Sequence, residues 1–224
     1  MPLAVYLLTV QKFGGIPVQT VSDKGTETSK LAAVQCALRE TFQPYLPSDT
    51  LPPHVFVKSV YNITRERAWR PLWAQDLANI LFRYETGKFD AGYQPENSIH
   101  AGVAYWLWGK IVQEHLDVVV KEKNTHKIRY QCRVTMPTGG RPEDFYRRPQ
   151  KWHGHDLLIP IPADTIDRLV AEHVRPELFQ FGTDEIVNLS SYLYEQLRRP
   201  TTTLNNGWSV FRAMMDLYEA SNLA

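Results

Sequence analysis

Two short β-like runs with an amphipathic segment between them constrain the fold of this chain more than any other feature. Residues 17–22 are β-branched and lie between turn residues, and residues 54–60 form a second run of this kind. Segment 29–42 has helical periodicity, with an inward side made of Leu31, Val34, Cys36 and Leu38. A strand–helix–strand unit is typical of α/β folds. Because stable sheets usually have about four to six strands, we expect a partner of residues 17–22 to be missing.

Helical periodicity predicts most of the other elements. The expected helices are residues 2–14, a segment from about 64 to 87, a long helix with Pro95 in its first turn, and residues 163–172, 183–199 and 208–220. Apolar stripes should face the core; they contain Trp69, Leu72, Trp73, Leu77 and Leu81, and then Ile99, Val103, Trp106, Leu107, Ile111 and Val118. Trp108 is assigned to the core as well.

The composition changes in the second half of the chain. Residues 121–129 are densely charged and indicate an exit to the surface, and residues 136–162 are rich in Pro and Gly. We therefore predict a first domain at 1–136 and a loop-rich, mainly helical region at 137–224.

The overall charge gives little support to nucleic-acid binding. The 25 Lys and Arg residues nearly balance the 24 Asp and Glu residues, for a net charge of +1. Two local basic clusters remain: one contains Arg65, Arg67 and Arg70, and the other contains Arg147, Arg148 and Lys151 beside Trp152. For each cluster taken by itself, a solvated face is the interpretation that we favour. Trp152 could stack on a base, although packing at a domain edge is the use that we favour.

The sequence also indicates where the protein resides. No apolar run approaches the roughly 18 residues that a membrane span needs, and the run from Leu3 to Val10 lacks the features of a secretory signal. Cys36 and Cys132 have no metal-ligand spacing and favour a reducing compartment. We therefore expect a nuclear or cytoplasmic protein.

Two carboxylates could carry chemistry. Asp23 ends the first β-like run before a glycine turn, and Glu66 lies in the first turns of an expected helix. Such a pair could bind Mg²⁺ or Mn²⁺, and two ions about 4 Å apart support phosphoryl transfer. A structural alternative stays open, in which Asp23 satisfies turn amides and Glu66 interacts with the helix dipole or with Arg70.

Several segments, taken in order, form a more specific pattern than any one of them. They are residues 14–17 (GGIP), 22–28 (SDKGTET), 52–62 (PPHVFVKSVYN), 66–70 (ERAWR), 105–108 (YWLW) and 124–129 (NTHKIR). Across roughly residues 4–145 this pattern resembles fungal integrase-core proteins, which are relatives of retroviral integrases and of transposases encoded by transposable elements. The resemblance implies a partial ribonuclease H-like fold, DNA as the partner and a role in DNA integration.

The resemblance also implies roles for individual residues. Asp23 is similar to the second acidic ligand of a DDE-type site, and Glu66 is similar to the third, with Mg²⁺ or Mn²⁺ as the cofactor. The implied DNA contacts come from Lys58, Asn62, Arg67 and Arg70. The role of Glu27, another motif residue, stays open.

Two departures from the family pattern affect the expected activity. The family's first catalytic Asp lies upstream of the helix that opens this chain, and residues 1–22 contain no Asp or Glu. We therefore expect a core that is truncated at its N-terminus and whose metal-dependent activity is lost or very weak. Tyr61 replaces the family's His, which weakens any role proposed at that position.

Other interpretations stay open. The chain could be a non-catalytic DNA-binding or protein-interaction remnant of a mobile element, and self-association is compatible with either function. It could also be a decayed product whose uncovered apolar surface favours aggregation. His153, His155 and Asp156 offer a weaker metal candidate, because no further ligand is near in sequence.

Overall fold

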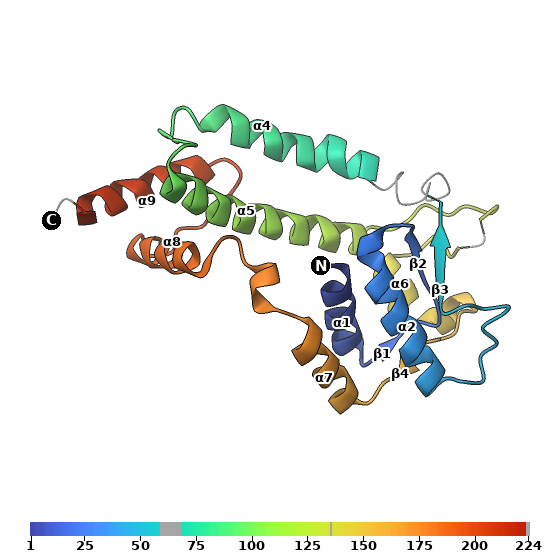
Figure 1. The fold of residues 1–224 in the computed structure, drawn as a ribbon. Coiled ribbons are helices and arrows are strands. Elements are labelled where there is room, and N and C mark those ends of the chain that lie inside the picture. The colour runs from blue at the N-terminus through green and yellow to red at the C-terminus, as the bar shows by residue number, and fades with distance from the viewer. Residues whose placement is uncertain (59–68, 135, 223–224) are drawn as a thin grey trace. The chain divides into compact units, whose positions relative to one another are not determined.

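The computed structural model describes residues 1–58, 69–134 and 136–222 (Figure 1). They form a mixed α/β structure of many helices and two small sheets. The chain divides into two compact units, here called unit 1 (Met1–Trp69 with Gly154–Leu178) and unit 2 (Arg70–His153 with Phe179–Ala224). Residue 136 lies inside unit 2, and the assignment of residues 1–136 to an integrase core stays a prediction. Within the described ranges, no helix is both long enough and apolar enough to cross a membrane.

Unit 1 combines three α-helices with all four described strands. Its elements are α1 (Pro2–Phe13), β1 (Gly15–Ile16), β2 (Thr20–Asp23), the 3-10 turn η1 (Thr26–Thr28), α2 (Ser29–Phe42), β3 (His54–Val57), β4 (Ile159–Pro160) and α7 (Ala163–His173), after which η5 (Pro176–Phe179) follows. The helix predicted at 29–42 is confirmed, as are the first helix and the helix near 163–172. Gly14 ends α1 with a φ of 70°, which glycine adopts without a steric cost.

The strands of unit 1 form two separate pairs. Strand β1 runs antiparallel to β4, with Gly15 opposite Pro160. A Cβ at Gly15 would lie 2.5 Å from the carbonyl oxygen of Ile159, so this pairing requires glycine. Strand β2 runs parallel to β3, and helix α2 connects them. The predicted strand–helix–strand unit is therefore confirmed, with strands shorter than the runs 17–22 and 54–60.

A hydrophobic cluster and a set of buried polar groups hold unit 1 together. The cluster contains Tyr6, Leu7, Val10, Ile16, Leu38, Ile159, Ile161 and Ile166. Gln35 on α2 is fully buried; its side chain donates to the carbonyl of Pro17 at 2.8 Å and accepts from the hydroxyl of Tyr6. Arg39 donates to the carbonyl of Val18 at 2.9 Å. These bonds fix α2 against the segment that leads into β2.

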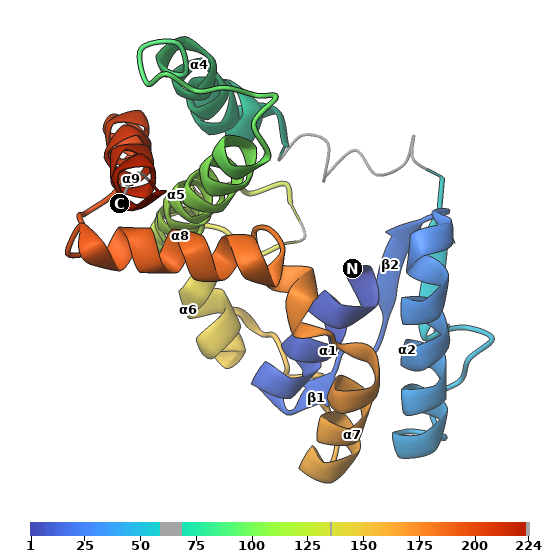
Figure 2. The same cartoon turned by 60° about the vertical axis from the view of Figure 1, so that its left-hand side comes forward.

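The regular elements described in unit 2 are all helices or helical turns. They are the π-helical turn η3 (Trp73–Leu77), α4 (Ala78–Gly87), α5 (Ser98–Thr125), α6 (Pro142–Arg147), the 3-10 turn η4 (Pro149–Trp152), α8 (Asp184–Gln196) and α9 (Gly207–Asn222). Figure 2 shows α8 and α9 beside α5, on which both helices pack. Pro95 precedes α5 rather than lying in its first turn. Asn97 caps this helix, because its side-chain oxygen accepts from the N–H groups of Ile99 and His100.

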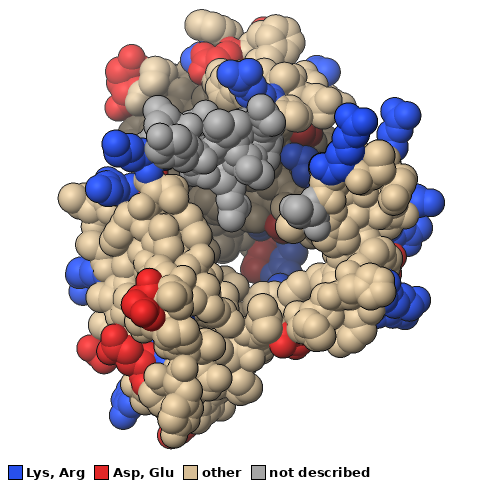
Figure 3. Space-filling view, turned by 90° about the vertical axis from the view of Figure 1, so that its right-hand side faces the viewer, with Lys and Arg blue, Asp and Glu red and all other residues tan. Residues whose placement is uncertain are grey.

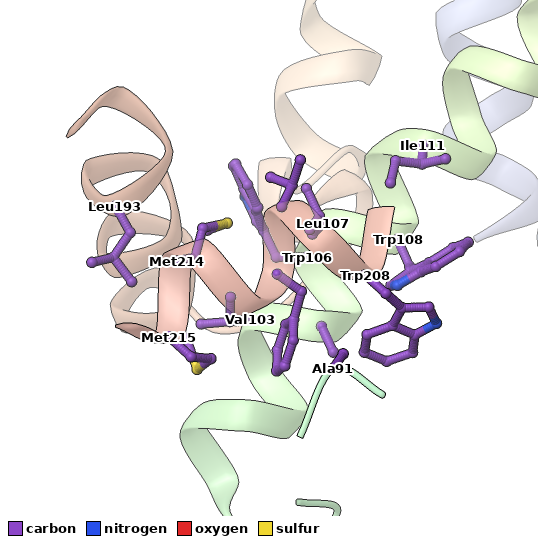
Figure 4. Close-up of a cluster of buried hydrophobic side chains, with 13 residues drawn as sticks. Ala91, Val103, Trp106, Leu107, Trp108, Ile111, Leu193, Trp208, Met214 and Met215 are labelled. Carbon is purple, nitrogen blue, oxygen red and sulfur yellow. The ribbon is translucent and has the colours of Figure 1, made fainter. Parts of the chain in front are cut away.

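Aromatic side chains dominate the core of unit 2. Trp108 and Trp208 lie side by side, with ring centroids 5.4 Å apart (Figure 4). The indole N–H of Trp208 donates to the carbonyl of Tyr84 at 2.9 Å, which ties α9 to α4. A Cβ at Gly87 would lie 2.3 Å from the Trp208 ring, so the close approach of these helices depends on this glycine. Burial of Trp106 and Trp108 confirms the sequence prediction.

The first predicted stripe is wrong in large part. Trp69 is 61% exposed, Trp73 is 55% exposed and Leu81 is 49% exposed. In the second stripe, Val118 is exposed, whereas Val103, Trp106, Leu107 and Ile111 are buried. Periodicity correctly predicted helices here, but it could not show which face has a neighbour.

Candidate functional site

The parallel pairing of β2 and β3 brings two motif segments to one edge of a sheet. Asp23, the last residue of β2, is the register partner of Val57, the last residue of β3. Lys58 follows directly, and both Asp23 and Lys58 are exposed. The carboxyl ends of parallel strands are where open α/β sheets bind ligands. The edge therefore presents one carboxylate and one ammonium group to solvent.

The turn after β2 leaves the Asp23 carboxylate free. The backbone carbonyl of Asp23 accepts from the N–H of Gly25 at 2.9 Å, and the hydroxyl of Thr28 donates to the carbonyl of Gly25 at 2.9 Å. The carboxylate itself makes no hydrogen bond to any residue that the structure describes. Backbone groups and the Thr28 hydroxyl thus close this turn, and no hydrogen bond from a turn amide to the Asp23 side chain is observed among the described residues.

A polar network around His54 joins the first motif to the second. One ring nitrogen of His54 lies 2.8 Å from the hydroxyl of Thr20, and the other lies 3.1 Å from the hydroxyl of Ser22. Ser22 also lies within 3.2 Å of the hydroxyl of Thr28. Burial lowers the pKa of His54, which favours the neutral ring that this network uses. Sequence analysis gave these residues no role, because their contacts depend on the strand register.

The other residues predicted for this site are only partly covered by the structure. Asn62, Glu66 and Arg67 lie outside the described residues. Arg70 is described and exposed, and it belongs to unit 2. The pairing of Asp23 with Glu66 therefore stays a prediction. Within the described part of the chain, no group of three or more His, Cys, Asp or Glu side chains could hold a metal ion.

The second basic cluster has an exposed charged part and a packed aromatic part. Arg147, Arg148 and Lys151 are exposed. Trp152 packs edge-on against Phe145, with ring centroids 4.7 Å apart, and this confirms the packing role favoured by the sequence. Figure 3 shows Lys and Arg side chains standing at the surface in separate groups, with mostly neutral residues between them.

The weaker metal candidate has a structural feature of its own. The carboxylate of Asp156 accepts from the N–H of Leu158 at 3.0 Å. His153 has a φ of 59° and ends η4 in the left-handed conformation. Both observations are explained by turn formation, so neither adds support for a metal there.

A polar site in unit 2 was missed by sequence analysis. His115 on α5 lies 3.2 Å from the carboxylate of Asp76 in η3. His115 also lines a cavity of about 460 Å³ together with Arg83 and Glu114. The two members of the pair are 39 residues apart, so no local spacing could have indicated the contact.

Comparison of the chain with models of protein families, with curated proteins and with solved structures found no match in any of the three. The resemblance to integrase cores therefore rests on the order of the motif segments. The contacts between two of those segments in unit 1 are an observation independent of that order.

Proposed function

We propose that this protein is related to DDE-type integrases and transposases, and that it binds DNA at the edge formed by the ends of β2 and β3. The observation that carries the proposal is the parallel register of these strands, in which Asp23 lies opposite Val57 in the middle of the second motif. A phosphodiester backbone is the substrate of metal-dependent phosphoryl transfer, and carboxylates at a strand end suit the metal ions that such a reaction uses.

The contacts between the two motifs support the proposal that both belong to one site. Ser22 in the first motif and His54 in the second share a hydrogen bond, although 32 positions separate them. Thr28, the last residue of the first motif, is buried, and its hydroxyl accepts a hydrogen bond from the hydroxyl of Ser22. Motif residues that hold one another in place at a strand end are expected of a former active site, where position matters most.

The resemblance assigns two metal-binding carboxylates to residues of this sequence, whereas a DDE-type site uses three. Asp23 offers one free carboxylate, and Glu66 would supply a second. A DDE-type site uses a third acidic ligand, and residues 1–22 contain none. Bound Mg²⁺ would stabilise charge on the reacting phosphate, but the ligand set is too small for two ions. We therefore expect this chain to bind DNA without joining DNA ends.

Salt-dependent binding to a mixed-sequence duplex tests the DNA contacts. Counterion release makes the logarithm of affinity fall linearly with the logarithm of salt concentration. Lys58→Ala and Arg67→Ala should each weaken binding and reduce that slope by about one. Arg168→Ala, which removes an exposed charge from α7, is the matched control and should change neither quantity. A flat salt response, or no binding at low salt, would contradict the proposal.

A strand-transfer assay with Mg²⁺ or Mn²⁺ tests the loss of activity separately. We expect no joined product from the wild-type chain under conditions in which it binds the duplex. Joining of DNA ends that Asp23→Asn abolishes would show an active centre, and the expectation of inactivity would then be wrong while DNA binding stood.

A further inference from the structure

The helical segment from Arg70 to Gly87 in unit 2 has apolar side chains on an inner side, which packs on the core, and on an exposed outer side. On the inner face, Ile80 is buried, and Tyr84 packs against Trp108 and Trp208 of the core. On the outer face, three large apolar side chains are exposed: Trp73 at 55%, Leu81 at 49% and Phe82 at 60%. A helix with apolar side chains on both its inner and its outer side is normally covered on both sides. The reason is that contact between apolar surface and water is unfavourable.

The π-helical turn η3 aligns these exposed side chains. The N–H of Ala78 bonds to the carbonyl of Trp73, five residues earlier, so this turn holds one residue more than an α-helical turn. The extra residue rotates the helix between Trp73 and α4. It places Trp73 in line with Leu81 and on the same side as Phe82, whereas a regular helix would place Phe82 on the opposite side. The wide turn thus gathers one apolar outer face.

Charged residues flank this outer face at its two ends. Arg70 lies three residues before Trp73, and Glu85 lies four residues after Leu81, so both lie along the same side of the helix. Both are exposed. One cation and one anion around an apolar centre do not suit a polyanion or an anionic membrane. They suit a protein surface that has the opposite order of charges.

The outer face of a second copy has this opposite order of charges when the two helices run antiparallel. Arg70 and Glu85 lie equally far in sequence from the point between Leu77 and Ala78, and so do Trp73 and Phe82. Two antiparallel copies related by a twofold axis at that point therefore oppose Arg70 to Glu85 twice and Trp73 to Phe82 twice. Small side chains near this axis, Ala74 and Ala78, allow close approach of the two helices.

We propose that the protein self-associates through this outer face as an antiparallel, twofold-symmetric dimer. Each apolar side chain of the face then meets an apolar side chain of the second copy, and each charge meets its opposite. Among the residues that the structure describes, Glu85 forms an ion pair with Lys88, which directly follows α4, and both side chains are partly exposed. An exposed pair of this kind contributes little and can be exchanged for the intermolecular pair.

Sedimentation equilibrium of the full chain, over a wide range of protein concentration, tests the proposal. The wild-type chain should show a reversible monomer–dimer equilibrium. Trp73→Ala should raise the dissociation constant by about a hundredfold, in the range expected for an aromatic residue at an interface centre. A chain that stays monomeric at every concentration, because its own residues or a different partner cover the face, would overturn the proposal.

Charge reversal tests the antiparallel arrangement. Arg70→Glu alone and Glu85→Arg alone should each raise the dissociation constant of the dimer about tenfold. In either variant, residue 70 of one copy and residue 85 of the other carry the same charge at each end of the interface. The double variant, and an equimolar mixture of the two single variants, should associate as the wild type does. Arg168→Glu on α7 is the matched control and should have no effect. Circular dichroism with thermal melting checks that all variants fold, and failure of both restorations would overturn the antiparallel pairing.

Discussion

Unit 1 and unit 2 are stabilised in different ways. Buried polar side chains fix the helices and strands of unit 1, and Gln35 and Arg39 are both almost fully inaccessible. In unit 2, packing of aromatic rings around Trp208 and Phe211 holds the helices together. Hydrogen bonds define one geometry more strictly than apolar contact does, since an unmade buried bond is costly. Polar bonds in unit 1 thus fix α2 against the segment that leads into β2, whereas apolar contacts hold the helices of unit 2 together.

The largest effect should come from the aromatic core of unit 2. Phe211 is fully buried, so Phe211→Ala should lower the free energy of unfolding by about 3–5 kcal/mol, through lost burial and a new cavity. Chemical denaturation followed by tryptophan fluorescence measures this loss. Phe89→Ala removes a ring that is 81% exposed and should be nearly neutral in dilute solution. Equal losses for the two variants would mean that the core is not packed as described.

A smaller effect should come from the polar interior of unit 1. Gln35→Ala leaves the hydroxyl of Tyr6 and the carbonyl of Pro17 without their partner, which should cost about 1–3 kcal/mol in the free energy of unfolding. Gln11→Ala on α1 is the matched control, because its bond to Asp167 is exposed. If the two variants were equally stable, the difference between the units would not hold.

The smallest effect should be a pH dependence that originates in unit 1. Because the pKa of His54 is lowered by burial, its neutral form is favoured in the folded state. The stability from this group is fully present above its ordinary pKa of 6.5 and is lost as the pH falls below that value. Urea unfolding at pH 7.5 and at pH 5.5, about one unit either side of that pKa, should show the loss. His54→Gln should reduce the difference, and an unchanged difference would place its origin elsewhere.

The sequence predicted elements better than it predicted contacts. Segment 29–42 was predicted with its observed bounds, because apolar spacing and flanking turn residues agree there. The stripe with Trp73 failed because periodicity shows that a helix has an apolar face and not that a neighbour covers it. The wide turn at Trp73–Leu77 also shifts the spacing on which such a prediction relies.

The position of the Asp23 carboxylate could be predicted from the sequence, whereas the polar network around His54 could not. Asp23 at a strand end followed from the Asp–Lys–Gly turn after a β-branched run. The network of Thr20, Ser22 and His54 did not, because it exists only when β2 and β3 pair in one particular register. Residues that lie far apart in sequence meet through that register, and no local pattern encodes it.

The most direct test of the central claim is a map of the backbone amide signals that change when a DNA duplex is added to the labelled full chain. The account predicts that the changes centre on the turn after Asp23 and on the chain around Lys58. They should decrease as salt is raised. Changes confined to unit 2, or no change at low salt, would contradict the assignment of this strand edge as a DNA-binding site.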